Sequence, residues 1–106
     1  MLVFSDVRSK TAFVGETAHF HCGSDETVIP QVDWFYQPPS DATAHFITSA
    51  GYPVNGHFNG RLSSNGTTLI INNVQVEDSG MFICAEDTRI RREHYVNFTV
   101  QGNFSD

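Results

Sequence analysis

The sequence is poor in cations and in long apolar runs. Its 106 residues hold six Lys and Arg against twelve Asp and Glu, which gives a formal charge of −6. Nucleic acids and anionic lipids both need a net basic footprint, so neither is expected as a partner, and we expect no direct membrane contact. No stretch approaches the roughly 18 consecutive apolar residues of a membrane-spanning helix, and residues 1–6 lack the features of a signal peptide. The sequence therefore predicts a soluble domain.

Cysteine is also scarce, since Cys22 and Cys84 are the only two. Two cysteines allow one disulfide, but a reduced cytosolic protein can hold two by chance. Three glycosylation sequons, at Asn65, Asn97 and Asn103, favour the secretory route. We therefore expect an extracellular domain, either the ectodomain of a single-pass membrane protein or a secreted protein.

Helical periodicity is missing, because no segment holds apolar residues at helical spacing for three turns. Short alternating segments between Gly, Pro, Asn, Asp and Ser clusters instead predict an all-β chain. The clearest expected strands are 17–22, 32–37, 45–48, 67–74, 81–85 and 95–100. Their inward-facing apolar sets predict two sheets packed as a sandwich. The length fits one domain, expected over residues 1–100, with 101–106 as a linker or the start of a stalk.

Three features together resemble the immunoglobulin superfamily: Cys22, Trp34 twelve residues later, and Cys84 preceded by Asp78-Ser79-Gly80. The resemblance implies an inter-sheet disulfide between Cys22 and Cys84, with Trp34 packed against it. Closing a loop of this length contributes about 4 kcal/mol in a chain-entropy estimate. Leu69 and Phe82 are expected in the same core.

Further matches narrow the resemblance to the variable type, or V-set, or to an intermediate set close to it. Gly60-Arg61-Leu62 and residues 68–74 resemble strands D and E of that family, and the 61 residues between the cysteines (23–83) suit an extra C' hairpin. The implied fold is a Greek-key V-type sandwich. In V-set domains the strand-D arginine pairs with the aspartate before strand F, which carries over to Arg61 and Asp78. Such a structural salt bridge is worth about 1 kcal/mol unless it is partly buried and bidentate.

Two departures from the family pattern are informative. Phe82 stands where the family often has its corner tyrosine, so the hydroxyl hydrogen bond of that corner is expected to be absent. Residues 95–100 lack the Phe-Gly-x-Gly bulge of rearranged antigen receptors. The resemblance is therefore to a germline receptor domain.

The family resemblance implies docking through the face formed by strands G, F, C and C'. By alternation, the outward positions are expected to be Phe35 and Gln37 on strand C, His45 and Thr48 on C', and Ile83 and Ala85 on F. An aromatic and a branched aliphatic residue facing solvent together, Phe35 and Ile83, would form a contact core. The alternative is that the protein's own C' loop covers them or that they are only half exposed.

The connection before the last strand is dense in charge around one apolar residue, and it corresponds to the third hypervariable loop of the family. Its candidate contact residues are Arg89, Ile90, Arg91 and Arg92. Arginines beside an isoleucine would dock on an acidic surface with an apolar centre. The alternative is a solvated hairpin whose charges pair across the strands.

Metal and catalytic interpretations are not favoured. His19 and His21 are expected about 7 Å apart on one face of a strand, but no further ligand at suitable spacing completes a site, so neither a metal nor a cofactor is expected. No Gly-x-Ser-x-Gly turn or comparable frame presents a nucleophile. We therefore expect a protein that is not an enzyme.

The expected function is extracellular recognition. A cell-surface receptor in immunity would bind a protein ligand or counter-receptor through the GFCC' face and the FG loop, and the alternative is homophilic adhesion, a self-dimer through the same face. Sialic-acid-binding lectins resemble this chain in fold but use a strand-F arginine, which residues 81–85 lack. A structural spacer would leave Phe35 and Ile83 unexplained. A glycan at Asn97 would cover one end of the docking sheet.

Overall fold

The computed structural model describes residues 5–22, 32–49, 52–53, 56–58, 60–65, 67–86 and 92–102. Their elements, in chain order, are β1 (Ser5–Phe13), β2 (Ala18–His21), β3 (Val32–Gln37), β4 (His45–Phe46), β5 (Thr48–Ser49), β6 (Tyr52–Pro53), β7 (Leu62–Asn65), β8 (Thr68–Ile71), the 3-10 turn η1 (Val76–Asp78), β9 (Gly80–Glu86) and β10 (Arg92–Gln101). The last strand extends through Gln101, one residue past the expected end of the domain.

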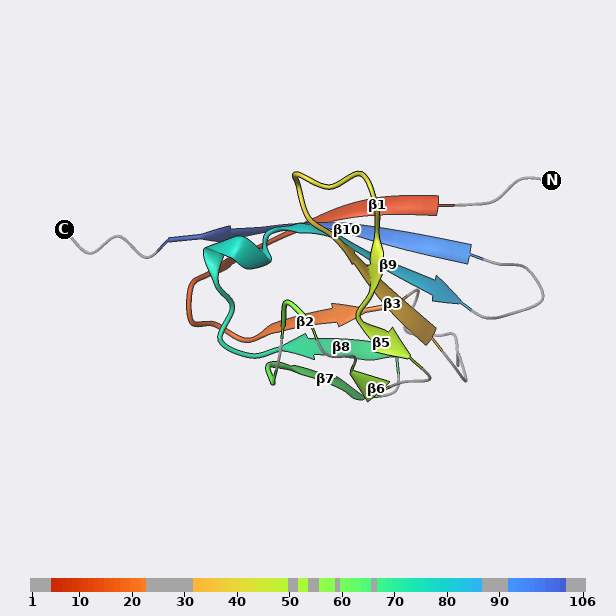
Figure 1. Ribbon diagram of the computed structural model, residues 1–106, viewed down its shortest axis with the longest axis horizontal. Coiled ribbons are helices and arrows are strands. Elements are labelled where there is room, and N and C mark those ends of the chain that lie inside the picture. The colour runs from red at the N-terminus through yellow and green to blue at the C-terminus, as the bar shows by residue number, and fades with distance from the viewer. Residues whose placement is uncertain are drawn as a thin grey trace.

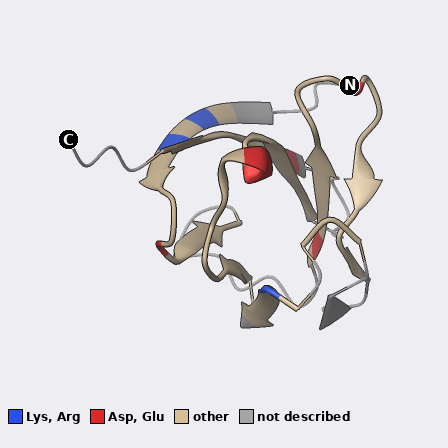
Figure 2. Cartoon of the chain, turned by 60° about the vertical axis from the view of Figure 1, so that its left-hand side comes forward, with Lys and Arg blue, Asp and Glu red and all other residues tan. Residues whose placement is uncertain are grey.

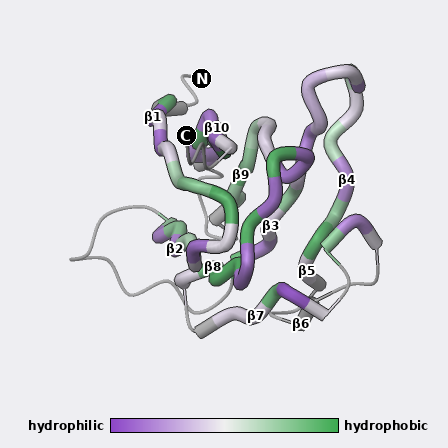
Figure 3. The backbone as a smooth tube through the Cα atoms, turned by 90° about the vertical axis from the view of Figure 1, so that its left-hand side faces the viewer, coloured by the Kyte–Doolittle hydropathy of each residue, from purple (hydrophilic) through white to green (hydrophobic). Residues whose placement is uncertain are grey.

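The strands form two packed sheets (Figure 1). One sheet has the order β1-β10-β9-β3-β4, the other has the order β2-β8-β7, and β5 and β6 form a separate hairpin. Figure 3, viewed along the layers, shows β1, β10, β9 and β3 on one side of the core and β2 and β8 on the other. The prediction of an all-β, two-sheet sandwich is confirmed.

The disulfide joins the two sheets. Cys22 follows β2 and Cys84 lies in β9, with 6.0 Å between their Cα atoms, and both side chains are completely buried. The predicted Cys22–Cys84 bond is therefore present. Trp34 of β3 is the register partner of Cys84, so the indole lies beside the bridge.

Aromatic side chains fill the space between the sheets. The Phe20 ring lies 4.8 Å from that of Phe82, 4.9 Å from that of Phe98 and 6.3 Å from that of Trp34, measured between centroids. Leu69 and Phe82 are completely buried, and Trp34 is almost so. Aromatic pairs at these distances add to the free energy of apolar burial, so Phe20 connects both sheets through one cluster.

Strand β1 was not among the clearest expected strands, because its sequence, SDVRSKTAF, is mostly polar. It pairs in parallel with β10 over nine register positions. Two cationic side chains of β1 form hydrogen bonds with the second sheet. Arg8 Nη2 donates to the His21 carbonyl at 3.3 Å, and Lys10 Nζ donates to the His19 carbonyl at 2.7 Å. These side chains occupy acceptors along the edge of β2, a role that charged residues commonly have at sheet edges.

The expected strand 45–48 is divided at Ile47 into β4 and β5. The Ile47 amide donates to the Trp34 carbonyl at 3.0 Å, and the Trp34 amide donates to the Thr48 hydroxyl at 2.9 Å. Thr48 is completely buried. Its expected outward position was wrong, because the bend at Ile47 turns the chain inward and the threonine hydroxyl replaces a ladder hydrogen bond.

Candidate functional site

One register position of the five-stranded sheet carries apolar side chains on every strand. Starting at β1, the neighbours across the ladder are Val7, Tyr95, Ile83, Phe35 and Phe46. They share the outward face, because the alternate positions of β3, β9 and β10 carry the buried core. We call these five residues the apolar row.

The apolar row is most exposed at its two ends. Val7 is 66% exposed and Phe46 is 57% exposed, whereas Phe35 and Tyr95 are half-buried and Ile83 is only 7% exposed. The expectation that Ile83 faces solvent was wrong, because Ile83 is buried at the middle of the row, where its register partners are Phe35 of β3 and Tyr95 of β10. Ala85 is also buried rather than exposed.

The sequence analysis did not predict Phe46 as an outward-facing residue. It expected His45 to occupy the outward position of strand C'. Phe46 is the register partner of Phe35, and their ring centroids lie 4.3 Å apart. His45 pairs in register with the inward-facing Tyr36. Because side chains alternate across a strand, an error of one residue in phase exchanged the two positions.

His45 is nevertheless exposed, at the edge of the sheet. Its Nε2 lies 2.8 Å from Asp41 Oδ2, and the Thr43 amide donates to Asp41 Oδ1 at 3.0 Å. Hydrogen bonds from His45 and Thr43 lower the pKa of Asp41 below its ordinary value. The pair orders the turn before β4, and with it the position of Phe46.

A shallow hollow of about 320 Å³ lies along the middle of the apolar row. Its walls include Phe35, Gln37, Ile83, Glu93 and Tyr95. Gln37 lies on the side toward the base of the sandwich, and Glu93 on the opposite side, where its carboxylate accepts a hydrogen bond from the Tyr95 hydroxyl at 2.8 Å. The hollow is thus apolar at its centre and polar at both margins.

Carboxylates are the charged groups of this outward face. Glu93 and Asp33 lie in register on either side of Ala85. Among the described side chains of the face there is no Lys or Arg, because Arg8 and Lys10 of β1 donate to carbonyls of β2. Figure 2 colours the described Lys and Arg blue and the described Asp and Glu red. The described face is therefore acidic beside its apolar row.

The expected contact loop lies mostly outside the described residues. This applies to Arg89, Ile90 and Arg91, while Arg92 is described only through its backbone at the start of β10.

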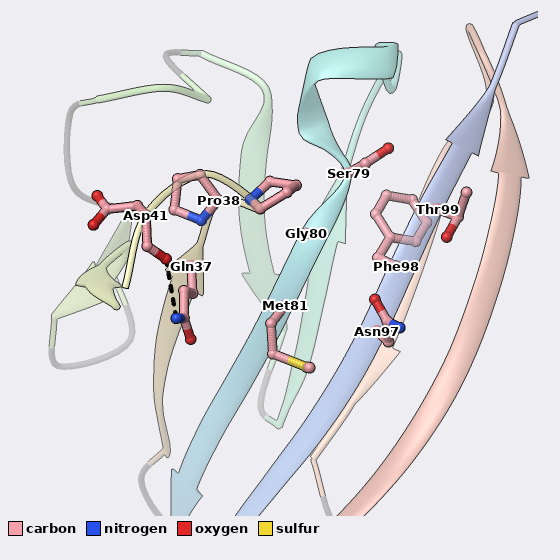
Figure 4. Close-up of a pocket in the computed structure, with 10 residues that line it drawn as sticks. Gln37, Pro38, Asp41, Ser79, Gly80, Met81, Asn97, Phe98 and Thr99 are labelled. Carbon is pink, nitrogen blue, oxygen red and sulfur yellow. Dashed lines mark hydrogen bonds between the residues drawn. The ribbon is translucent and has the colours of Figure 1, made fainter. Parts of the chain in front are cut away.

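Of the three sequon asparagines, one has a described side chain. Asn65 is described through its backbone at the end of β7, and Asn103 lies outside the described residues. Asn97 is exposed on the outward face of β10, next to Met81 of β9 (Figure 4).

Arg61 and Asp78 form a bidentate pair at the base of the sandwich. Arg61 Nη1 donates to Asp78 Oδ2 at 2.6 Å and Nη2 donates to Oδ1 at 2.9 Å. Asp78 is completely buried and also accepts hydrogen bonds from the Gln75 amide at 2.7 Å and from His57 Nε2 at 2.9 Å. Burial raises the pKa of Asp78, but the bonds from Arg61, Gln75 and His57 together lower it below the ordinary value. His57 was not anticipated from the sequence.

The corner above this pair is held by a tyrosine from another strand. Tyr36 of β3 donates its hydroxyl to the Ser79 carbonyl at 2.7 Å and to the Glu77 carbonyl at 3.2 Å. The expectation of a corner without a hydroxyl bond was wrong, because the Tyr36 ring packs beside that of Phe82, 5.0 Å between centroids, and its hydroxyl supplies the missing group. Burial, and then the charge of Asp78, raise the pKa of Tyr36 to about 12.

Gly80 makes room for that tyrosine. A Cβ at this position would lie 2.7 Å from the Gln37 carbonyl and 2.9 Å from the Tyr36 ring, and the backbone has φ +150°. A side chain would displace the ring, so the glycine and the tyrosine are required together.

The described residues offer neither a metal site nor a membrane-spanning helix. They contain no cluster of three or more His, Cys, Asp and Glu placed to hold a metal ion. They also contain no helix that is long and apolar enough to cross a bilayer.

Comparisons with known sequences agree with this architecture. Residues 6–101 match the immunoglobulin V-set domain. The chain is 30% identical over 82 residues to the Ig kappa chain V region 3368 of Oryctolagus cuniculus, covering 74% of both sequences. It is 33% identical over 76 residues to T cell receptor alpha variable 7 of Homo sapiens, covering 69% of this chain and 68% of that one.

A solved structure shares the fold at lower sequence identity. The crystal structure of Dscam1 isoform 6.9, N-terminal four Ig domains, superposes with a TM-score of 0.68 at 19% identity. The match covers 91% of this chain and 23% of that chain, so the chain spans about a quarter of its length.

Proposed function

The chain belongs to the immunoglobulin V-set family, and from that premise we propose that it is the ligand-recognition domain of a cell-surface immune receptor. V-set domains of antibodies and T-cell receptors are non-enzymatic binding modules, typically extracellular or secreted, and this chain is accordingly not an enzyme. The proposed binding surface is the outward face of β10, β9, β3 and β4, which is the GFCC' face of the family. The loop containing Arg89, Ile90, Arg91 and Arg92 extends it.

The apolar row is the observation that carries this proposal. Two phenylalanines in ring contact, Phe35 and Phe46, lie on the outward face, and the Phe46 side chain is more than half exposed. Isolated exposed apolar residues are ordinary on protein surfaces, whereas a contiguous row with aromatic residues is typical of contact sites. The hollow beside Phe35 would receive an apolar side chain of the ligand.

Charge favours a partner other than a second copy. The row is bordered by Asp33 and Glu93, and the described part of the face offers them no Lys or Arg from an identical molecule. A protein ligand with an apolar centre and a basic margin would match both features. The homophilic alternative requires the arginines of the connecting loop to supply the complement.

The test compares two exposed apolar residues. Phe46 of the row is 57% exposed, and Val76 of η1, outside the row, is 53% exposed. Each is replaced by glutamate, Phe46→Glu and Val76→Glu, and multimers of each domain are screened against a panel of purified receptor ectodomains. We expect Phe46→Glu to weaken any wild-type interaction by about 30-fold, the effect of losing about 2 kcal/mol at a hot spot, and Val76→Glu to change it less than about twofold.

Sedimentation velocity of the same three proteins addresses the homophilic alternative. We expect a monomer. A wild-type dimer that Phe46→Glu dissociates and Val76→Glu retains would replace the receptor proposal by homophilic adhesion. Binding that survives Phe46→Glu unchanged would contradict use of this face.

A further inference from the structure

A second hollow, of about 310 Å³, lies at the base of the outward face (Figure 4). It is separate from the hollow of the apolar row, sharing only Gln37 with it. Pro38 and Pro39 form one wall, Gly80 and Met81 of β9 form the floor, and Asn97 and Thr99 of β10 form the opposite side. This volume is at the lower end of the range for small-ligand sites, about 300–1,000 Å³, which suits a group of the size of one sugar.

The polar groups around this hollow are largely engaged by the protein itself. Gln37 Nε2 donates to the Asp41 carbonyl at 3.1 Å, the Asp41 carboxylate binds His45 and the Thr43 amide, and the Ser79 hydroxyl accepts from the Val100 amide at 2.9 Å. What the hollow offers to a ligand is therefore mostly the apolar surface of the prolines and Met81.

Asn97 is placed to deliver a covalent group into this hollow. Its side chain is exposed, and within the described part of the chain no hydrogen bond engages its amide. Thr99, which completes the sequon, is exposed on the same face, whereas Phe98 between them points into the core and is nearly completely buried. A modification at Asn97 can thus extend over the face without disturbing the core.

We propose that Asn97 carries an N-linked glycan and that its first N-acetylglucosamine lies in this hollow, against Pro38, Pro39 and Met81. The donor is a lipid-pyrophosphate-linked oligosaccharide. A bond forms between Asn97 Nδ2 and C1 of the sugar while the bond from C1 to the pyrophosphate oxygen breaks. The lipid pyrophosphate leaves with the electron pair, and the amide loses a proton to the transferase.

The contact is hydrophobic in character. A pyranose ring presents C–H groups on its face, and burying them against proline and methionine removes apolar area from water. The prolines are already rigid, so little conformational entropy is lost at that wall. The sugar would cover the register row of Asn97, Met81 and Gln37, which is adjacent to the apolar row, and would mark the lower limit of the docking surface.

The first test is chemical and uses protein secreted by a cell line that makes only high-mannose glycans. Asn65→Gln and Asn103→Gln remove the other two sequons, so that Asn97 is the single acceptor. Mass spectrometry of the peptide containing residues 95–100 is expected to find Asn97 modified. Secreted protein with an unmodified Asn97 would overturn the proposal.

The second test asks where the first sugar lies. Endoglycosidase H leaves one N-acetylglucosamine on the asparagine, whereas Asn97→Gln leaves none. The chain has two methionines, Met1 and Met81, so ¹³C-methyl methionine labelling gives a readily assigned signal. We expect a nuclear Overhauser effect between the Met81 methyl and the sugar in the trimmed protein, and a Tm within about 1 °C of that of the untrimmed protein.

The comparison between the trimmed protein, which keeps one sugar, and Asn97→Gln, which has none, tests whether that sugar stabilises the domain. We expect Asn97→Gln to lower Tm by about 4 °C, which corresponds to about 1 kcal/mol for a domain of this size, while Met81→Ser makes trimmed and unglycosylated proteins equal in Tm. If Asn97 is glycosylated but neither the Overhauser contact nor the Tm difference is seen, the sugar points into solvent. That result would overturn the proposal that the first sugar lies in the hollow.

Discussion

At the base of the sandwich a carboxylate is completely buried, whereas on the outward face of the five-stranded sheet a phenylalanine is more than half exposed. Asp78 is accompanied by four hydrogen bonds from Arg61, His57 and the Gln75 amide. Phe46 contacts the ring of Phe35 and is 57% exposed. The buried carboxylate is stabilised by hydrogen bonds within the domain, whereas part of the apolar area of the face stays exposed.

The largest effect is expected from breaking the base. Asp78→Ala leaves the half-buried Arg61 without its anion, and loss of one partner from a buried pair typically costs about 3–5 kcal/mol. We expect a loss of that size in the free energy of unfolding, measured by urea denaturation. The neighbouring Glu77→Ala, at an exposed position, is the control and should change stability by less than about 0.5 kcal/mol. Equal effects of the two variants would contradict the role of the buried pair.

The same pair predicts a pH dependence. The pKa of Asp78 is lowered in the folded protein from its ordinary 3.8, so its stabilisation is present above that value and is lost as the pH falls through and below it. Acid unfolding of the wild type should therefore show a loss of stability below about pH 4 that Asp78→Asn does not show. A wild type and variant with parallel acid profiles would mean that Asp78 titrates normally.

An intermediate loss of stability is expected in the middle of the outward face, because the residue there is buried like those at the base. Ile83 lies on the outward side but is 7% exposed, so Ile83→Ala should cost about 2–4 kcal/mol like a core residue. Phe46→Ala, in the same row but exposed, should cost less than about 1 kcal/mol. Thermal unfolding of both variants distinguishes them. A small effect at Ile83 would show that the rings of Phe35 and Tyr95 do not cover it.

A smaller effect at neutral pH than those of Asp78→Ala and Ile83→Ala is expected from removing one hydroxyl. Tyr36→Phe keeps the ring but deletes the bonds to the carbonyls of Ser79 and Glu77, at a cost of about 1 kcal/mol. The raised pKa of about 12 adds a second signature, because a raised pKa stabilises the fold below the unfolded value of 10 and this stabilisation is lost as the pH rises toward 12. The difference between wild type and Tyr36→Phe should therefore shrink and reverse between pH 10 and 12. A constant difference would contradict the buried hydroxyl.

The sequence predicted what depends on local spacing. The cysteines, Trp34 and the Asp-Ser-Gly segment before β9 lie at the separations that a variable-type sandwich needs, and alternation assigned the inward residues of β2, β3, β8, β9 and β10. The pairing of Arg61 with Asp78 came from the family pattern, and its geometry in the structure is bidentate.

What the sequence did not predict depends on neighbours across strands. The alternation of side chains along a strand identifies the face on which Ile83 lies. Whether Ile83 is exposed to solvent on that face depends on the side chains of the adjacent strands. Tyr36 could replace the corner tyrosine because β3 lies beside β9, and nothing in the local sequence of either strand states that. Phe46 was missed because a bend at Ile47 shortened the strand from which the phase was counted.

The parallel ladder between β1 and β10 has a mechanical consequence. The chain enters β1 at one end of the sheet and leaves β10 at the other, because the two strands run in the same direction (Figure 1). Tension applied between those two ends pulls the strands past each other along their lengths, so that the hydrogen bonds of nine register positions share the load in shear rather than opening one after another. A domain built in this way resists extension along these two strands, while the disulfide protects the residues between Cys22 and Cys84 from extension.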